Sequence, residues 1–145
     1  MTLRDDFINA LELKPPRGRV PHFELVFYLT MEAFGRVHPT HRSFHQWTQM
    51  SENERKLHRR DVADLYVSTA RRFEQAGILF HPPAGWQEDD IRLCFEQIRE
   101  ISGNEFLLML HGDATYGLPS GGNMMDFVMK LAEQTDEMKA SAQRN

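Results

Sequence analysis

The residues best suited to chemistry lie in one short, glycine-rich stretch. His111, Asp113 and Tyr116 bring an imidazole, a carboxylate and a phenol within six residues. A carboxylate can orient an imidazole for acid–base catalysis, and glycines let backbone approach a ligand closely. We therefore predict His111 and Asp113 as catalytic residues and Tyr116 as a substrate-binding residue. The alternative is an ordinary loop in which Asp113 caps a turn; a phosphate-binding loop is excluded because no lysine follows the glycines in the required position.

Two further candidates are associated with expected strands. His81 comes directly after the apolar stretch 78–80, and Glu24 lies within the apolar stretch 20–28. His22 should share a face with Glu24, because side chains two apart on a strand point the same way. We predict that His81 and Glu24 bind substrate. The alternative for Glu24 is a structural ion pair with an arginine or histidine, since a lone buried carboxylate is costly.

Three histidines have spacing that resembles a metal site. His38, His41 and His45 lie three and four residues apart, but no carboxylate or cysteine adjoins them, and Pro39 disfavours the helix that would make them converge. We predict no metal there. Cys94 falls on an apolar helical stripe, which favours a place in the core over a role as nucleophile.

The elements that must position these residues alternate between helix and strand. The strands are expected near 20–28, 78–80 and 106–110, each preceded by a helix. Connections between them are too long for hairpins, which favours right-handed crossovers and a parallel sheet. Ligands bind at the carboxyl ends of such strands, so His81, His111 and Asp113 should lie at one edge of the sheet.

Local signals mark where the helices begin and end. Thr2 with Asp5, and Ser51 with Glu54, have the spacing of capping boxes at helix starts. The helix that begins after Ser51 has an apolar stripe of about seven turns, and its basic run over residues 55–60 is expected to face solvent. Gly77 stands where a left-handed residue is expected after the helix. The apolar stripe consists of Leu57, Val62, Leu65, Tyr66, Thr69, Phe73 and Ala76. The next helix should close at Gly103, and Asn123 with Asp126 should cap a helix carrying Phe127, Val128 and Leu131.

Length and composition limit the class of protein. The 145 residues fit a single domain spanning 1–145, well short of the roughly 250 residues of an eight-unit β/α barrel. Seventeen basic against 21 acidic residues make nucleic acid an unlikely partner. The single cysteine excludes an internal disulfide, and the sequence shows no apolar run long enough for a signal peptide or a membrane span. We predict a cytoplasmic protein without a membrane partner.

Several stretches resemble the uroporphyrinogen decarboxylase superfamily, which also contains cobalamin-dependent methyltransferases. The opening through Arg19-Val20-Pro21 and the stretch 106–119 are similar to the start and the third strand of that family. Gly35-Arg36-x-x-Pro39-x-x-Arg42 resembles part of the decarboxylase signature. The resemblance spans nearly the whole chain. It implies an α/β fold, the N-terminal portion of a TIM (β/α)8 barrel, with about three parallel β-α units preceded by a helix.

Departures from the decarboxylase pattern indicate which branch is involved. Glu32 stands where the family has an arginine that holds substrate carboxylates, and His81-Pro82 stands where it has an aspartate that contacts pyrrole N–H groups. Both changes argue against uroporphyrinogen as substrate. The resemblance therefore implies a divergent branch similar to corrinoid-dependent methyltransferases, with Arg36 binding an anion. The zinc ligands of that branch come from later strands and are absent from this chain.

Three functions stay open from the sequence. The first is a superfamily enzyme acting on a tetrapyrrole-linked or small-molecule substrate, with a corrinoid or porphyrin as ligand or a corrinoid protein as partner. The others are a porphyrinogen carboxy-lyase of haem biosynthesis and a truncated, non-catalytic binding or assembly module. Three β-α units would supply half a pocket, so we expect a homo-oligomer or a missing C-terminal portion, and no turnover by the chain alone.

Overall fold

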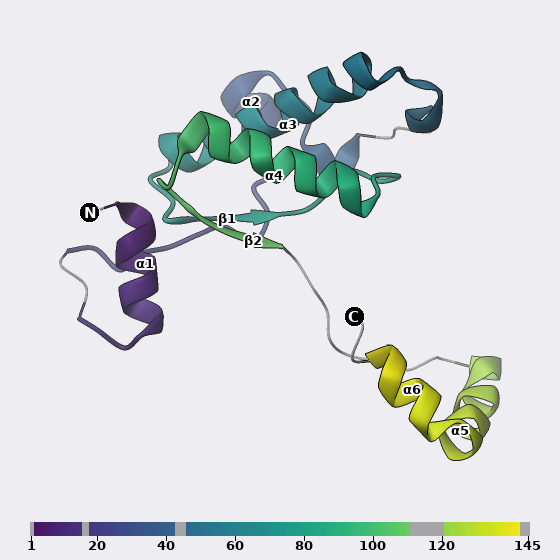
Figure 1. Cartoon of the computed structure of the whole chain (residues 1–145). Coiled ribbons are helices and arrows are strands. Elements are labelled where there is room, and N and C mark those ends of the chain that lie inside the picture. The colour runs from purple at the N-terminus through teal and green to yellow at the C-terminus, as the bar shows by residue number, and fades with distance from the viewer. Residues whose placement is uncertain (1, 16–17, 43–45, 111–120, 143–145) are drawn as a thin grey trace. The chain divides into compact units, whose positions relative to one another are not determined.

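The computed structural model describes residues 2–15, 18–42, 46–110 and 121–142, and helices dominate these ranges (Figure 1). In chain order the elements are α1 (Leu3–Leu11), α2 (Thr30–Phe34), 3-10 helices at Pro39–His41 and Trp47–Gln49, α3 (Glu52–Arg72), β1 (Gly77–Phe80), α4 (Glu88–Ser102), β2 (Leu107–Leu110), a 3-10 helix at Gly121–Asn123, α5 (Met124–Glu133) and α6 (Thr135–Ala142). The chain divides into two compact units, residues 1–111 and 112–145.

The sheet of the first unit has two parallel strands. β1 and β2 pair in register from Gly77 with Leu107 to Phe80 with Leu110, and α4 forms the crossover between them. The backbone N–H of Leu107 donates to the carbonyl of Ala76 at 3.0 Å, a bond that belongs to the pairing of Gly77 with Leu107. The strands predicted near 78–80 and 106–110, and their parallel direction, are confirmed.

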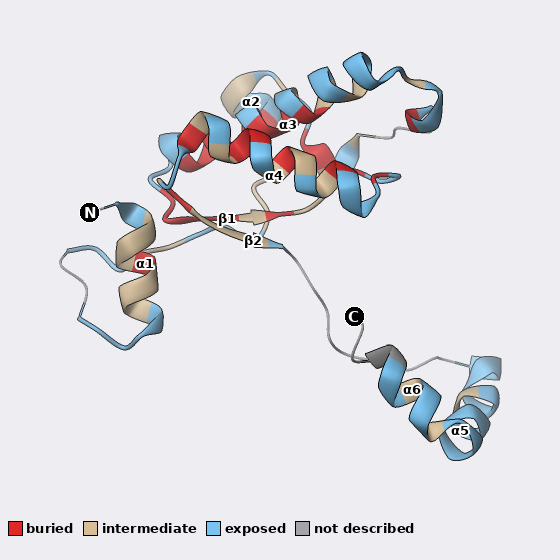
Figure 2. Ribbon diagram, viewed as in Figure 1, coloured by how far each residue is buried: buried red, intermediate tan, exposed pale blue. Residues whose placement is uncertain are grey.

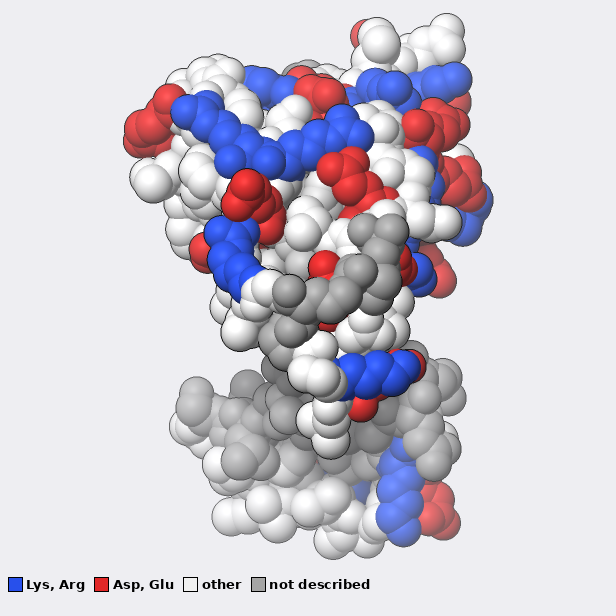
Figure 3. All heavy atoms as spheres, turned by 90° about the vertical axis from the view of Figure 1, so that its left-hand side faces the viewer, with Lys and Arg blue, Asp and Glu red and all other residues white. Residues whose placement is uncertain are grey.

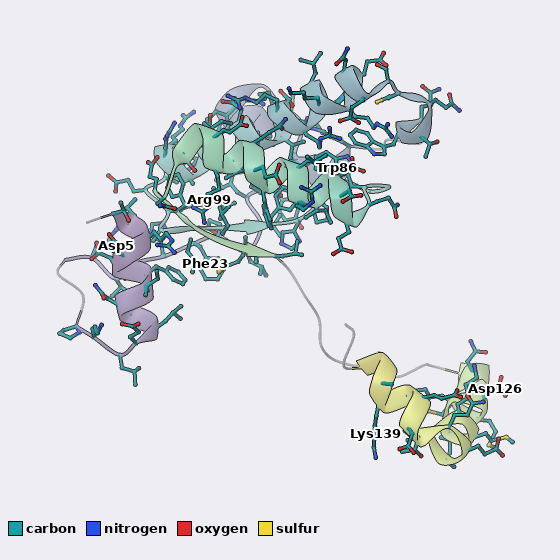
Figure 4. All side chains as sticks on the ribbon, in the orientation of Figure 1. Asp5, Phe23, Trp86, Arg99, Asp126 and Lys139 are labelled. Atoms are coloured by element: carbon teal, nitrogen blue, oxygen red, sulfur yellow. The ribbon has the colours of Figure 1, made fainter. Side chains whose placement is uncertain are left out.

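The prediction of three β-α units from a TIM barrel is wrong. Within the described ranges the sheet contains only β1 and β2, and the predicted strand at 20–28 is extended chain without a ladder. The carbonyl of His22 accepts a 2.7 Å bond from the N–H of Ala76, and Phe23 packs its ring 5.7 Å from that of Phe7 on α1 (Figure 4). These contacts hold the segment beside the sheet without making it a strand.

Exposure explains why the apolar composition of 20–28 misleads. Val20 is 70% exposed and Leu25 is 61% exposed, so the run is not buried on both faces as a central parallel strand would be. Pro21 also lacks the N–H that a ladder needs. An apolar run predicts a buried strand only where other elements cover both of its faces.

The core of the first unit lies between the sheet and the pair α3 and α4 (Figure 2). The stripe predicted on α3 is right for Val62 and Leu65 but wrong for Leu57, which is 70% exposed. Burial raises the pKa of the Cys94 thiol to about 12, so this side chain is a protonated part of the core. The buried core cluster consists of Trp47, Val62, Ala63, Val67, Ala70, Ile78, Phe80, Trp86, Cys94, Ile98 and Phe106.

The helix starts follow their local signals. The N–H of Asp5 donates to Thr2 Oγ1 at 3.3 Å, and the Asp5 carboxylate accepts from the N–H of Thr2 at 2.7 Å. Ser51 and Glu54 make the same reciprocal pair at the start of α3. Both predicted capping boxes are therefore confirmed. For α4 the cap is Gln87, whose N–H donates to the Asp90 carboxylate at 3.2 Å.

The two predicted C-terminal glycines have different roles. Gly103 has φ +57° and ends α4, as predicted. Gly77 is already in β1, and the left-handed residue after α3 is Glu74, with φ +53°. A Cβ on Gly77 would lie 2.9 Å from the Met109 side chain and 3.3 Å from the Leu107 carbonyl oxygen. Gly77 is thus suited to close strand packing, not to helix termination.

A buried polar network joins the amino-terminal ends of α3 and α4. Arg59 is only 2% exposed, so the expectation that the basic run 55–60 faces solvent is wrong for this residue, whereas Lys56 and Arg60 are exposed. Its guanidinium pairs with Asp90 at 2.8 Å and with Glu52. The other Asp90 oxygen accepts from the indole N–H of Trp47 at 2.8 Å. Asp90 is thereby fixed by an arginine, an indole and its own helix cap.

The second unit is a pair of short helices with little burial. No described residue of α5 is buried, and Met125 and Val128 are half-exposed or more (Figure 2). Asn123 precedes α5 but makes no side-chain capping bond, so that predicted cap is wrong. Across the described part of the chain, every helix is too short or too polar to cross a bilayer.

Candidate functional site

Half of the predicted site falls in a stretch that the structure leaves undescribed. His111, Asp113 and Tyr116 lie outside the described residues, so their predicted roles stay predictions. The strand ends that precede His81 and His111 do lie side by side, because Phe80 pairs with Leu110. The geometry of the site can therefore be built from the β1 side.

Five rings gather at the carboxyl end of β1, and we name them the imidazole–phenol cluster. Its members are Tyr28, His38, His41 and Tyr66, whose rings lie next to one another, and His81, which lines the same pocket as His38 and Tyr66. The rings of Tyr28 and His41 are nearly parallel, with 13° between planes and 5.4 Å between centroids. His38 lies 5.8 Å from Tyr28, 5.9 Å from His41 and 6.1 Å from Tyr66. The cluster thus joins a loop, α3 and the strand end.

Tyr66 fixes the backbone of His81. The phenol of Tyr66 donates to the His81 carbonyl at 3.0 Å and accepts from the His81 N–H at 3.1 Å. Burial raises the pKa of Tyr66, so the phenol keeps its proton. The His81 ring contacts the Leu25 carbonyl through Nε2 at 2.9 Å, which identifies Nε2 as the protonated nitrogen. His81 is therefore held at both its backbone and its ring.

His38 is the buried member of the cluster. Burial lowers its pKa to about 4, and the nearby His41, His81 and Arg42 act in the same direction. Its Nδ1 lies 2.7 Å from the Thr40 hydroxyl and 3.3 Å from the Thr40 N–H, as the cap of a short 3-10 helix. Because Nδ1 accepts from that N–H, the proton of the neutral ring belongs on Nε2. At neutral pH His38 is an uncharged imidazole.

A small pocket opens beside the cluster. Glu24, Thr30, His38, Gln75 and His81 are among the residues that line it, and its volume is about 20 Å³. Two of the predicted substrate-binding residues, Glu24 and His81, are therefore brought together. Glu24 is exposed, so its carboxylate can be hydrated and does not require a buried partner.

Arg36 is engaged by acidic side chains of α3. Its guanidinium pairs with Asp61 at 2.6 Å and with Asp64 at 2.7 Å, and Arg42 also pairs with Asp61. Burial alone would raise the pKa of Asp61, but the hydrogen bond and charge of Arg42, together with Arg36, lower it. These pairs anchor the loop before α3 onto the helix. The two carboxylates also neutralise the positive charge of Arg36, which the family resemblance implied would bind an anion.

Most of the imidazole–phenol cluster was not identified as a site from the sequence. His38 and His41 were considered only for their metal-like spacing, and Tyr28 and Tyr66 were not considered for the site at all. The spacing of three residues from His38 to His41 is the sequence feature that could have indicated this part of the cluster. In a 3-10 helix, which has three residues per turn, side chains three residues apart lie on the same side. His45 lies outside the described residues, and the described ones contain no group of three metal ligands.

Charges on the surface are mixed. On the face in Figure 3, Lys and Arg side chains lie beside Asp and Glu side chains. Exposed pairs include Arg60 with Glu100 at 3.0 Å and Arg71 with Glu105 at 2.8 Å. Pairs of this kind leave less uncompensated positive charge for binding a phosphate backbone.

Comparison with known proteins adds no further constraint on the site. No protein-family model, curated protein or solved structure matches this chain. The resemblance to the uroporphyrinogen decarboxylase superfamily therefore stays a prediction from sequence motifs. What the chain does has to be argued from the imidazole–phenol cluster and its surroundings.

Proposed function

We propose that this chain binds a corrinoid or related tetrapyrrole at the imidazole–phenol cluster, as part of a divergent protein related to corrinoid-dependent methyltransferases. The observation that carries the proposal is the nearly parallel, solvent-facing pair of Tyr28 and His41 next to His38 and His81. Flat macrocycles bind by stacking on such rings, and imidazoles are ligands for their metals.

The location of the cluster supports ligand binding. It adjoins the carboxyl end of β1, where ligands bind in parallel α/β sheets. Tyr28 is 59% exposed, so one of its faces is accessible to a large planar molecule. The pocket of about 20 Å³ is too small for such a ligand, which would lie across the exposed rings.

The charge balance favours a corrinoid over a polycarboxylate. Arg42, whose charge acts on His38, pairs with Asp61, and Arg36 pairs with Asp61 and Asp64. Glu24 lines the pocket, and Glu32 is exposed on α2. A porphyrinogen with several carboxylates would meet little uncompensated positive charge here. The carboxy-lyase alternative is accordingly the weaker one.

Absorption spectroscopy tests this proposal. Titration of the full chain with aquocobalamin should shift the visible bands of the corrinoid, and Tyr28→Ala and His41→Ala should each weaken binding at least about fivefold, the equivalent of about 1 kcal/mol. His22→Ala is the matched control, because His22 lies outside the cluster. An absent shift, or equal loss in the control, contradicts the proposal. Tighter binding of uroporphyrin would favour the carboxy-lyase alternative.

The exposed apolar segment 20–29 supports a second candidate, a non-catalytic binding or assembly module. Val20, Leu25, Tyr28 and Leu29 are all more than half exposed along this segment. Exposed apolar stretches of this kind mark protein–protein contacts. This candidate predicts association through segment 20–29 without any tetrapyrrole, so Leu25→Lys should lower the average mass that light scattering measures for the ligand-free chain.

A further inference from the structure

Two polar side chains in the pocket beside the cluster lack partners. Thr30 is 2% exposed and Gln75 is 5% exposed, and both line the pocket. Among the described residues, neither Thr30 Oγ1 nor Gln75 Nε2 has a hydrogen-bond partner. Buried polar atoms in folded proteins are nearly always paired with protein or ordered water. A single polar ligand in the pocket would give both atoms a partner.

The pocket size identifies the class of ligand. A buried water needs a cavity of roughly 10–15 Å³, and the pocket measures about 20 Å³. One water fits, whereas an organic substrate does not. The neighbouring hydroxyl of Thr69 is already used, because it donates to the Leu65 carbonyl at 2.8 Å. Thr30 Oγ1 and Gln75 Nε2 are thus buried polar atoms of pocket-lining residues that have no protein partner in the described part of the chain.

The chemistry of the two side chains sets the direction of the bonds. An amide nitrogen only donates, so the ligand must accept from Gln75 Nε2. A hydroxyl both donates and accepts, so the ligand can donate to Thr30 Oγ1. Water meets both requirements, whereas an ammonium ion cannot accept.

We propose that one long-lived water molecule is bound in this pocket, accepting from Gln75 Nε2 and donating to Thr30 Oγ1. The bridge ties the first residue of α2 to the residue that follows α3 and its turn. It holds the start of α2 next to the imidazole–phenol cluster, and it does not depend on what that cluster binds.

Isosteric substitutions should change the melting temperature in opposite directions depending on whether the water is bound. With the water present, Thr30→Val and Gln75→Met each remove one of its partners, and each should lower the melting temperature by about 2–6 °C. The double variant should lose less than the sum, because both changes disrupt the same bridge. Without the water, each substitution replaces an unpaired buried polar atom by an apolar one and should raise the melting temperature.

A control and a direct measurement complete the test. Thr69→Val lies in the same pocket, but its hydroxyl has a protein partner, so its effect should add to that of Gln75→Met. Oxygen-17 relaxation dispersion of the unaltered full chain should detect a long-lived internal water, and the double variant should have one fewer. A raised melting temperature, additive losses at Thr30 and Gln75, or no long-lived water in the unaltered chain would each overturn the proposal.

Discussion

At the scale of single residues, His38 links the candidate site to stability. Its neutral ring caps a 3-10 helix and packs against three other rings of the cluster. A charged ring would be disfavoured there by burial first and then by His41, His81 and Arg42. Protonation of His38 therefore has to be accompanied by loss of folding free energy.

We expect the free energy of unfolding to fall as the pH is lowered from about 6.5 to about 4. In that interval the unfolded chain binds a proton at His38 and the folded chain does not, so stability is present above pH 6.5 and is lost below it. The loss reaches up to about 3 kcal/mol, at about 1.4 kcal/mol per pKa unit. Urea unfolding at several pH values measures this dependence.

A non-titrating cap isolates the contribution of His38. Asn is a good helix cap without a titrating ring, so His38→Asn should flatten the pH dependence between 6.5 and 4. His22→Asn, which removes a histidine outside the cluster, is the control against which the slope is compared. If the free energy of unfolding of His38→Asn depended on pH as steeply as that of the unaltered chain, the pH dependence could not be attributed to His38.

How much of the site could be predicted depended on the kind of signal each residue carries. His81 follows a strand directly, and the sequence pattern correctly predicted its place at the carboxyl end of β1. The engagement of Arg36 was not foreseeable, because Asp61 and Asp64 lie 25 and 28 residues away and no local pattern links them. Partners so far apart in sequence can be assigned only from the tertiary structure, in which the loop before α3 packs on that helix.

At the scale of elements, the network around Asp90 joins α3, α4 and the 3-10 helix at Trp47–Gln49. Arg59, Asp90 and Trp47 are all buried, so each polar atom depends on its partners within the network. Removing one member leaves the polar atoms of the others buried without their hydrogen-bond or ion-pair partner. The network is therefore sensitive to single substitutions.

We expect Arg59→Leu to destabilise the chain by about 3–5 kcal/mol, because it leaves the Asp90 carboxylate buried without its cation. Arg60→Leu is the matched control one position along the same helix. Arg60 is half-exposed and pairs with exposed Glu100, so its loss should cost less than about 1 kcal/mol. Denaturant unfolding of both variants gives the comparison, and similar losses would contradict the buried-pair argument.

The elements show which sequence patterns were sufficient. Capping boxes and the 3.6-residue periodicity depend on near neighbours in the chain, and they located the starts of α1 and α3 correctly. The strand assigned to 20–28 depended on what covers it. Among the described residues, only the unit β1–α4–β2 combines the apolar strand pattern with packing elements that bury it. One of the three expected units is therefore present there.

At the scale of the whole molecule, each of the two units has to be considered by itself. The second unit exposes a set of apolar side chains on α5: Met124, Met125, Val128, Met129 and Leu131. Its helices α5 and α6 bury no described residue. Such a surface is unusual for a monomer and promotes association.

We expect the purified chain to self-associate in a concentration-dependent way. Val128→Lys together with Leu131→Lys should reduce the average mass measured by light scattering, because both side chains lie within the exposed apolar set of α5. Leu13→Lys is the control, since Leu13 is exposed but lies outside that set. A monomer at all concentrations, or an equal effect of the control, would contradict this expectation.

The parallel pairing of β1 with β2 has a consequence for how the chain is made. β1 ends at Phe80, and its partner begins 27 residues later, at Leu107. A ribosome adds about 5–20 residues per second, so β1 waits roughly one to five seconds for its partner to be synthesised. During that interval the apolar side chains of Ile78 and Phe80 have no β2 to pack beside. The edge of β1 that pairs with β2 is therefore without its partner strand throughout that interval of synthesis.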